Sequence, residues 1–369
     1  MKRKPATAAN VPSSSTFERV VKRVAGVGVI LSLLLGLFQA AKLVHDARDR
    51  MARVDEMVRV AQVQSDRDEP AQAWAGLARA IALTDEAGPL ESSLWAVQRR
   101  RRTMQMQQQD VAMQWLRDGR PGPGHAFSEI VDQVVPALES AVADPAVIGQ
   151  RRADLLAHLG WARFLKSRDG FTTADPATDY GSALVADPHN AYAHAFWGHW
   201  TLWRRGNLAA ASAHFADALA DPRAGKGPLR GYLRMLNVTA LRNAPSLQTD
   251  AALLVLVNGM RTGGEPIDAE TRNTLKNVYQ GFGRDRQETA ALLQAVPPAA
   301  QVATLQQLAF DEPAMRAVLA QLLEAAGQQA EALQVWRALR ADPAVAGNLT
   351  AQADAAIKRL APVAAKAER

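Results

Sequence analysis

The 369-residue sequence predicts an all-α protein, in which a series of helical hairpins follows a single N-terminal transmembrane helix. Three observations support this fold class. Residues 24–41 form one strongly apolar segment. From about residue 66 onward, apolar residues recur with the period of a helix, and Pro or Gly interrupts the pattern every 12–20 residues. Segments in which polar and apolar residues alternate, as they do in half-buried strands, are missing.

The apolar segment predicts a transmembrane helix over residues 20–43. Of the 18 residues in 24–41, only Ser32 and Gln39 interrupt the apolar and small side chains, and a helix of that length spans about 27 Å. A cleaved signal peptide is the alternative. Its apolar core is usually ~7–15 residues long, and residues 38–40 do not form a cleavage site with two small residues, so we expect the helix to be retained.

Basic residues on the two sides of this span predict its orientation. Six precede it and four follow soon after it, so the positive-inside rule keeps the N-terminus in the cytoplasm. Residues 1–19, which contain Pro and several Ser, predict a disordered cytoplasmic tail. The Arg-rich and Ala-rich composition is typical of bacteria with GC-rich genomes, so we expect the bacterial inner membrane and a periplasmic C-terminal domain. A reversed topology, with a cytoplasmic adaptor domain, is the alternative.

Small residues recur at every fourth position of the span, which places them on one helix face: Gly28, Ser32, Gly36 and Ala40. Such a face lets a second helix approach closely. We therefore expect either pairing with a partner's membrane helix or a homo-oligomer formed through this helix.

Residues 44–118 predict a helical extension of the span followed by an N-terminal helical group. Apolar and small residues of the extension follow three-four spacing at Val44, Ala47, Met51, Val54, Val58 and Ala61. Two interpretations remain open: a short parallel coiled coil, or packing on Ala73, Leu77 and Ala80 of the same chain. Gly and Pro in residues 119–124 predict a break before the next group of helices.

Repeats begin after this break. The tripeptide Ala-Asp-Pro occurs five times, and residues 186 and 220, which begin two of its copies, lie 34 residues apart. The residues between them include Trp197-Gly198, Gly206-Asn207, and then Ala211, Phe215 and Ala218. In period and pattern the segment resembles a tetratricopeptide repeat (TPR). The resemblance implies a TPR-like solenoid with hairpins over 126–225, degenerate repeats over 226–310, and a last hairpin with a capping helix over 311–369.

In the TPR family, peptide ligands lie against the first helices of successive hairpins. Transferred position by position, this implies a partner-binding groove at Asp154, Trp161, Phe164, Tyr192, His199, Leu202 and Trp203. The groove is aromatic and apolar, and Trp161 and His199 stand where the family's carboxylate-binding subgroup has Asn. The alternative is that these aromatic side chains pack neighbouring hairpins together.

The charge distribution argues against a nucleic-acid partner. The chain carries a net charge of +6, and residues 1–50 hold nine basic and three acidic groups. The whole excess therefore lies beside the apolar segment, and the rest of the chain is neutral. The basic run at residues 99–102 is interpreted as a solvated helix face, with a nucleic-acid or anionic-lipid patch as the alternative.

No motif for catalysis, a cofactor or a metal stands out. The chain has no Cys, no phosphate-binding Gly-rich loop, and no His-Glu-x-x-His pair. His189, His194 and His199 are five residues apart, so successive side chains point about 140° away from each other on a helix. We therefore expect no enzyme activity, no cofactor and no metal site.

Together these patterns predict a membrane-anchored interaction scaffold. We expect an assembly factor of a bacterial cell-envelope machine, of the secretion, pilus or cytochrome-maturation type, that binds a protein partner in or at the membrane. The alternative is an envelope-polymer enzyme, or an accessory subunit of one.

Overall fold

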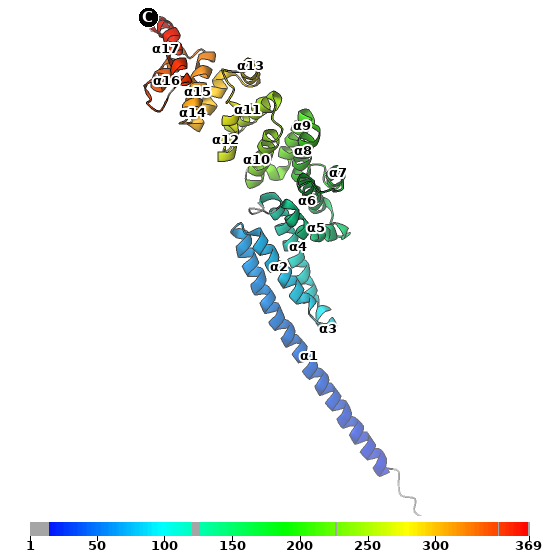
Figure 1. The fold of residues 1–369 in the computed structure, drawn as a ribbon. Coiled ribbons are helices and arrows are strands. Elements are labelled where there is room, and N and C mark those ends of the chain that lie inside the picture. The colour runs from blue at the N-terminus through cyan, green and yellow to red at the C-terminus, as the bar shows by residue number, and fades with distance from the viewer. Residues whose placement is uncertain (1–14, 120–125, 226, 346, 368–369) are drawn as a thin grey trace, which may run out of the picture. The chain divides into compact units, whose positions relative to one another are not determined.

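A computed structural model describes residues 15–119, 126–225, 227–345 and 347–367. The described residues are almost entirely helical and contain no strand, which confirms the all-α class (Figure 1). The chain divides into two compact units, Met1–Pro121 and Gly122–Arg369, here called unit 1 and unit 2. Their boundary falls within residues 119–124, where the sequence predicts a break; residues 120–125 lie outside the described residues.

One helix, α1 (Ser15–Asp66), contains the whole apolar segment. It is long and apolar enough to cross a membrane, and its apolar window is entirely exposed. The helix begins five residues before the predicted start at residue 20, so residues 15–19 are helical rather than part of a disordered tail. Residues 1–14 of the predicted tail lie outside the described residues.

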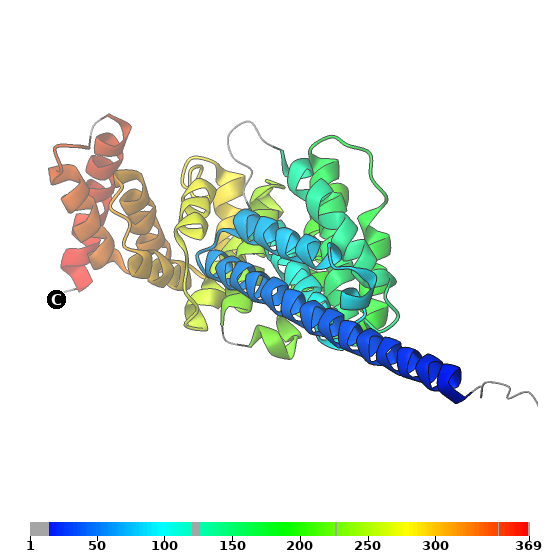
Figure 2. The same cartoon turned by 90° about the horizontal axis from the view of Figure 1, so that it is seen from below.

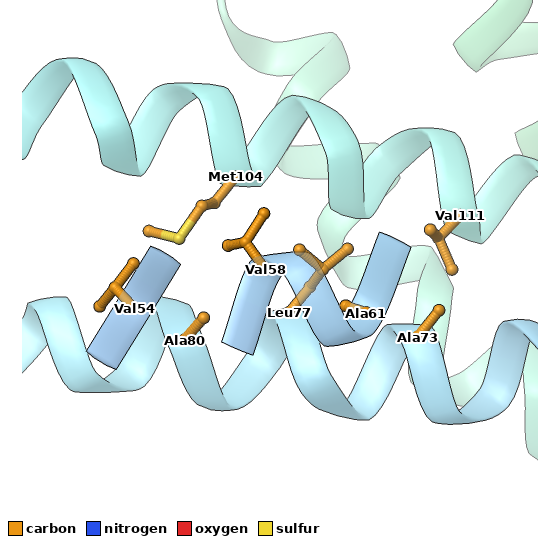
Figure 3. Close-up of a cluster of buried hydrophobic side chains, with 8 residues drawn as sticks. All are labelled: Val54, Val58, Ala61, Ala73, Leu77, Ala80, Met104 and Val111. Atoms are coloured by element: carbon orange, nitrogen blue, oxygen red, sulfur yellow. The ribbon is translucent and has the colours of Figure 1, made fainter. Parts of the chain in front are cut away.

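The second half of α1 packs within unit 1. It lies side by side with α2 (Pro70–Asp85) (Figure 2). Helix α2 in turn contacts α4 (Trp95–Asp118), and the short α3 (Pro89–Ser92) connects these two helices along the chain. Side chains from α1, α2 and α4 interlock in one buried cluster (Figure 3): Val54, Val58, Ala61, Ala73, Leu77, Ala80, Met104 and Val111. Of the two interpretations of the extension, packing within the chain is therefore the one found.

Unit 2 is a succession of helices joined by short loops. Its first half contains α5 (Phe127–Ala143), α6 (Gly149–Arg168), α7 (Pro176–Ala186), α8 (Ala191–Arg205), α9 (Leu208–Ala220), the 3-10 turn η1 (Pro222–Ala224), α10 (Pro228–Arg242) and α11 (Leu247–Thr262). Its second half contains α12 (Ala269–Val278), α13 (Arg286–Ala295), α14 (Pro298–Leu308), α15 (Pro313–Ala325), α16 (Gln329–Ala341) and α17 (Asn348–Ala367).

Sequence neighbours pack together in pairs, such as α6 with α7, α8 with α9, and α15 with α16. Alternate helices also touch: α6 contacts α8, α8 contacts α10, and α10 contacts α12. These contacts bring α6, α8, α10 and α12 next to one another, and the candidate sites lie on these helices and on α11.

The α8–α9 pair illustrates how the sequence sets these contacts. Gly206 ends α8 in the left-handed region, with φ +61°, and the side chain of Asn207 caps α9 by accepting from the Ala210 N–H. Gly198 faces α9 so closely that a Cβ there would lie 3.3 Å from the Phe215 ring. A glycine at position 198 therefore lets the two helices of the pair approach.

Candidate functional site

The predicted groove residues lie on two adjacent helices, but most of them face the interior. Asp154, Trp161 and Phe164 belong to α6; Tyr192, His199, Leu202 and Trp203 belong to α8. The buried members are Trp161, Phe164, His199 and Leu202, which are 6%, 1%, 2% and 2% exposed. A partner docked on the described surface would reach Asp154, Tyr192 and Trp203 but not these four.

The buried aromatic side chains form the contact between α6 and α8. The Trp161 ring stacks on Phe196 with centroids 4.6 Å apart. The His199 ring meets Trp161 edge-on at 5.2 Å and Phe164 at 5.3 Å. These are the offset and edge-to-face arrangements that stabilise aromatic pairs. The side chains therefore hold two helices together, which is the alternative to a groove.

His199 is a neutral packing residue. Burial, together with the positive charge of Arg168, lowers its pKa from 6.5 to about 3. Its Nδ1 atom has no hydrogen-bond partner among the described residues. An imidazole that stays neutral and lies between Trp161 and Phe164 neither carries charge nor takes up a proton at neutral pH.

Asp154, at the start of this region, belongs to a charge network. Its carboxylate accepts hydrogen bonds from Arg223 Nη1 at 3.0 Å and Asn190 Nδ2 at 2.7 Å. Arg223 also donates to Asp221 at 2.9 Å and lies 5.8 Å from the centre of the Tyr192 ring. Burial alone would lower the pKa of Arg223, but the hydrogen bonds to Asp221 and Asp154 raise it above its ordinary value. The network links α6, α8 and η1 and fixes Asp154 in place.

A pocket of about 920 Å³ lies between α10 and α11, and its lining residue Tyr232 adjoins the aromatic contact, 6.4 Å from the Phe196 ring. Its volume falls within the ~300–1,000 Å³ range of small-molecule and cofactor sites. Glycine, arginine and methionine dominate its lining, which consists of Gly225, Gly227, Arg230, Gly231, Tyr232, Arg234, Met235, Met260, Gly263, Gly264, Glu265, Pro266 and Asp268.

Glycine positions the central carboxylate of this pocket. Helix α11 ends at Thr262, and Gly264 takes φ +67°, which an L side chain rarely adopts. The next N–H, that of Glu265, then donates back to the Met260 carbonyl at 2.8 Å, in the manner of a Schellman turn. This turn directs Glu265 towards α10.

Two arginines one turn apart on α10 hold Glu265. Arg230 Nη2 donates to Glu265 Oε1 at 2.8 Å, and Arg234 Nε donates to Oε2 at 2.9 Å. The hydrogen bond from Arg234, followed by that from Arg230, keeps the pKa of Glu265 below its ordinary value although burial opposes it. A carboxylate that stays ionised between two guanidinium groups is a poor general acid, so the pocket favours binding over acid catalysis.

The pocket keeps unused binding capacity. Arg234 Nη1 has no hydrogen bond among the described residues, and a Cβ added at Gly231 or Gly264 would meet no atom within 4 Å. Asp268, at the edge of the pocket, is engaged as the cap of α12, since it accepts from the Thr271 N–H. The pocket therefore offers open space beside a guanidinium donor. Elsewhere in the described parts of the chain, no group of three or more His, Asp or Glu side chains is arranged to hold a metal ion.

The small residues of the predicted membrane helix are exposed along α1. A Cβ added at Gly28 or Gly36 would meet nothing within 4 Å, and Ala40 is exposed. The Ser32 hydroxyl donates to the Gly28 carbonyl of its own helix at 2.9 Å, so its polar group is satisfied without a partner. The face is open to a second helix, and pairing through it stays a prediction.

The chain matches no protein-family model, and no curated protein is significantly similar to it. Sequence patterns missed the α10–α11 pocket, although one signal for it is present: two arginines spaced four apart on a helix, and a Gly-Gly-Glu turn some thirty residues later.

Proposed function

We propose that the protein is a membrane-anchored interaction scaffold that binds a partner protein through unit 2, with α1 as the anchor. The observation that carries this proposal is the α10–α11 pocket, which combines open apolar space with an arginine donor and holds its central carboxylate, Glu265, in the ionised form. Tethering restricts the domain and a membrane partner to the same surface and so raises their effective concentration.

The finer architecture is part of the proposal. The pairing of consecutive helices and the contacts between alternate helices support a TPR-like solenoid. In such an array α6, α8, α10 and α12 would line one face, with the half-buried Tyr192 and the exposed Trp203 on α8 and the pocket beside α10. We place the anchor in a bacterial inner membrane, with unit 2 in the periplasm as part of an envelope assembly system.

The ligand of the pocket is proposed to be a segment of the partner. An apolar side chain would occupy the space beside Met235 and Met260, and an oxygen acceptor of the segment would bind Arg234 Nη1. Because Glu265 already neutralises part of the positive charge, a carbonyl or a single carboxylate suits the site better than a densely charged group.

A pair of glycine substitutions tests the pocket. Gly231→Leu places a side chain in the pocket, and Gly259→Leu adds the same side chain to α11 outside the pocket; at both positions the added Cβ meets no atom within 4 Å. Both replace a helical glycine by a better helix former, so both variants are expected to fold. Partners are captured from solubilised membranes by tagged full-length protein and identified.

We expect Gly231→Leu to lose at least one partner that the wild type and Gly259→Leu retain. An identical set of partners for all three proteins would exclude the pocket as the binding site.

Orientation has a separate test. Alkaline phosphatase fused after Arg369 is expected to be active, and a fluorescent reporter that matures only in the cytoplasm is expected to be dark at the same site, because the positive-inside rule keeps the N-terminus in the cytoplasm. The reverse pattern would place unit 2 in the cytoplasm and favour the adaptor alternative.

A further inference from the structure

One end of unit 1 lies beside the C-terminal half of α1, at the part of that half nearest the apolar segment (Figure 1). Helix α2 runs back along α1, and the chain then turns through α3 into α4. Arg50 of α1 fixes this turn, since its Nε donates to Glu91 of α3 at 2.8 Å, and Glu91 is 6% exposed. Residues 91–99 are called the α3–α4 corner below.

One ion pair and one hydrogen bond between α1 and α4 show which residues of α1 are level with this corner. Arg100 of α4 pairs with Asp55 of α1 at 2.6 Å, and Ser65 of α1 donates to Gln114 of α4 at 3.2 Å. Both pairs match later residues of α4 with later residues of α1, so the two helices run parallel. Trp95 lies five residues before Arg100 on α4. Because the two helices run parallel, Trp95 is level with the residue of α1 that lies five positions before Asp55, which is residue 50.

That height is close to the surface of a bilayer centred on the apolar segment. The predicted span has its centre near residue 33, so residue 50 lies about 25 Å from the bilayer centre at 1.5 Å per residue. The hydrocarbon core ends about 15 Å from the centre, and the headgroups extend to about 20–22 Å. Side chains of a helix tilt towards its N-terminus, which for α4 is the membrane side, and a tilt of the span lowers the corner further. The Trp95 ring therefore reaches the headgroup layer.

The side chains at the corner suit that layer. Trp95 is 70% exposed, and the guanidinium carbon of Arg99 lies 5.1 Å from the centre of its ring. Trp is enriched at membrane interfaces, and an Arg near the surface is attracted to anionic lipids. In contrast, Arg100 and Arg101 are engaged in ion pairs with Asp55 and Asp85 inside unit 1.

We propose that the α3–α4 corner docks on the lipid headgroup layer, with Trp95 inserted among the headgroups and Arg99 bound to lipid phosphate. Lipid is the occupant because the corner belongs to the same rigid bundle as the span and stands at headgroup height. The inference rests on the proposed anchoring by α1. It gives unit 1 a second contact with the membrane and so restricts rotation of the bundle about the axis of α1.

The absence of Cys from the sequence makes a depth measurement direct. A spin label is attached to one introduced cysteine in the full chain, which is reconstituted in phosphatidylcholine vesicles with or without phosphatidylglycerol. Ala96→Cys probes the corner, Leu37→Cys is the membrane reference, and Asp66→Cys is the aqueous control; all three positions are exposed. Depth is given by collision rates with oxygen, which concentrates in lipid, and with a water-soluble nickel chelate.

We expect the Ala96 label to lie at a depth between the other two, and deeper with phosphatidylglycerol. Adding Trp95→Ala should bring its nickel collision rate up to that of the Asp66 label, whereas Trp203→Ala, a change of another exposed Trp, should leave it unaltered.

Three outcomes would overturn the inference. If the Leu37 label is immersed and the Ala96 label is as aqueous as the Asp66 label, anchoring stands and corner docking fails. If the Leu37 label is also aqueous, the anchor itself fails and docking fails with it. If the Ala96 label is shielded from oxygen and nickel alike, the corner is covered by protein, either a second copy or another chain, instead of lipid.

Discussion

Two neighbouring helix contacts of unit 2 are built in opposite ways. Between α6 and α8, large aromatic side chains fill the space, and Trp161, Phe164 and His199 are each less than a tenth exposed. Between α10 and α11, Gly231, Gly263 and Gly264 leave about 920 Å³ open, and an ion-paired carboxylate links the two sides. A contact between two helices of unit 2 is thus closed where the side chains are large and leaves a pocket where glycines replace them.

The strongest test of this contrast is to remove a ring from each side of the packed contact. Phe164→Ala should lower the free energy of unfolding by about 3–5 kcal/mol, because it leaves a cavity in a filled interior. Trp203→Ala should cost about 1 kcal/mol or less, because Trp203 is 46% exposed. Denaturant unfolding of both variants measures the difference. Equal losses would mean that α6 and α8 are not held together as described.

Trp203→Ala also addresses the predicted groove. If Trp203 anchors a partner, the substitution should weaken partner binding by more than about 2 kcal/mol while the fold stays intact. Binding that is unchanged would leave the exposed α8 surface without a role in recognition.

The packed contact should also be sensitive to acid. The unfolded chain binds a proton at His199 with a pKa near 6.5, but the folded chain binds it only at about 3. Below pH 6.5 the unfolded state therefore holds more protons, and stability falls as the pH falls, by up to about 1.4 kcal/mol per pH unit. His199→Phe keeps a ring in the contact and removes this contribution. Unfolding measured from pH 7 to 4 should show a shallower slope for the variant, and parallel slopes would contradict the assignment.

Alanine at two glycines should have effects of opposite sign. A Cβ at Gly160 of α6 would lie 2.5 Å from the ring of Tyr180, which is fully buried, so Gly160→Ala should destabilise the protein by about 1–3 kcal/mol. At Gly231 of α10 a Cβ has open space, so Gly231→Ala should stabilise by about 0.5–1 kcal/mol through helix propensity. Thermal unfolding of the two variants compares them. A loss at Gly231 would show that the pocket is filled by something other than solvent.

Local sequence signals predicted the features that depend on neighbouring residues. The helical period predicted the all-α class, and the apolar run predicted the long N-terminal helix. The three-four pattern at Val54, Val58 and Ala61 also placed the extension against α2, as one of two alternatives. Each of these features follows from side chains three or four positions apart on one helix.

Features that depend on helix rotation and on distant segments were not predictable in the same way. The groove positions came from a family pattern, which fixes spacing along a helix but not which face meets its neighbour, and so Trp161 and Phe164 lie inside. The pocket combines Arg230 and Arg234 with Glu265 across a region where the repeat pattern fades. These three residues come together only through tertiary packing, which a local period in the sequence does not predict.

Helix α1 continues without interruption from the apolar segment into the bundle of unit 1. If α1 spans a membrane as proposed, residues 44–66 form a lever about 34 Å long above the bilayer. Transmembrane helices tilt by about 20° on average, and such a tilt would move the far end of this lever sideways by about 12 Å. Tilt adjusts to bilayer thickness. The thickness and composition of the surrounding lipid would therefore determine the lateral position of the far end of the unit 1 bundle relative to the membrane segment.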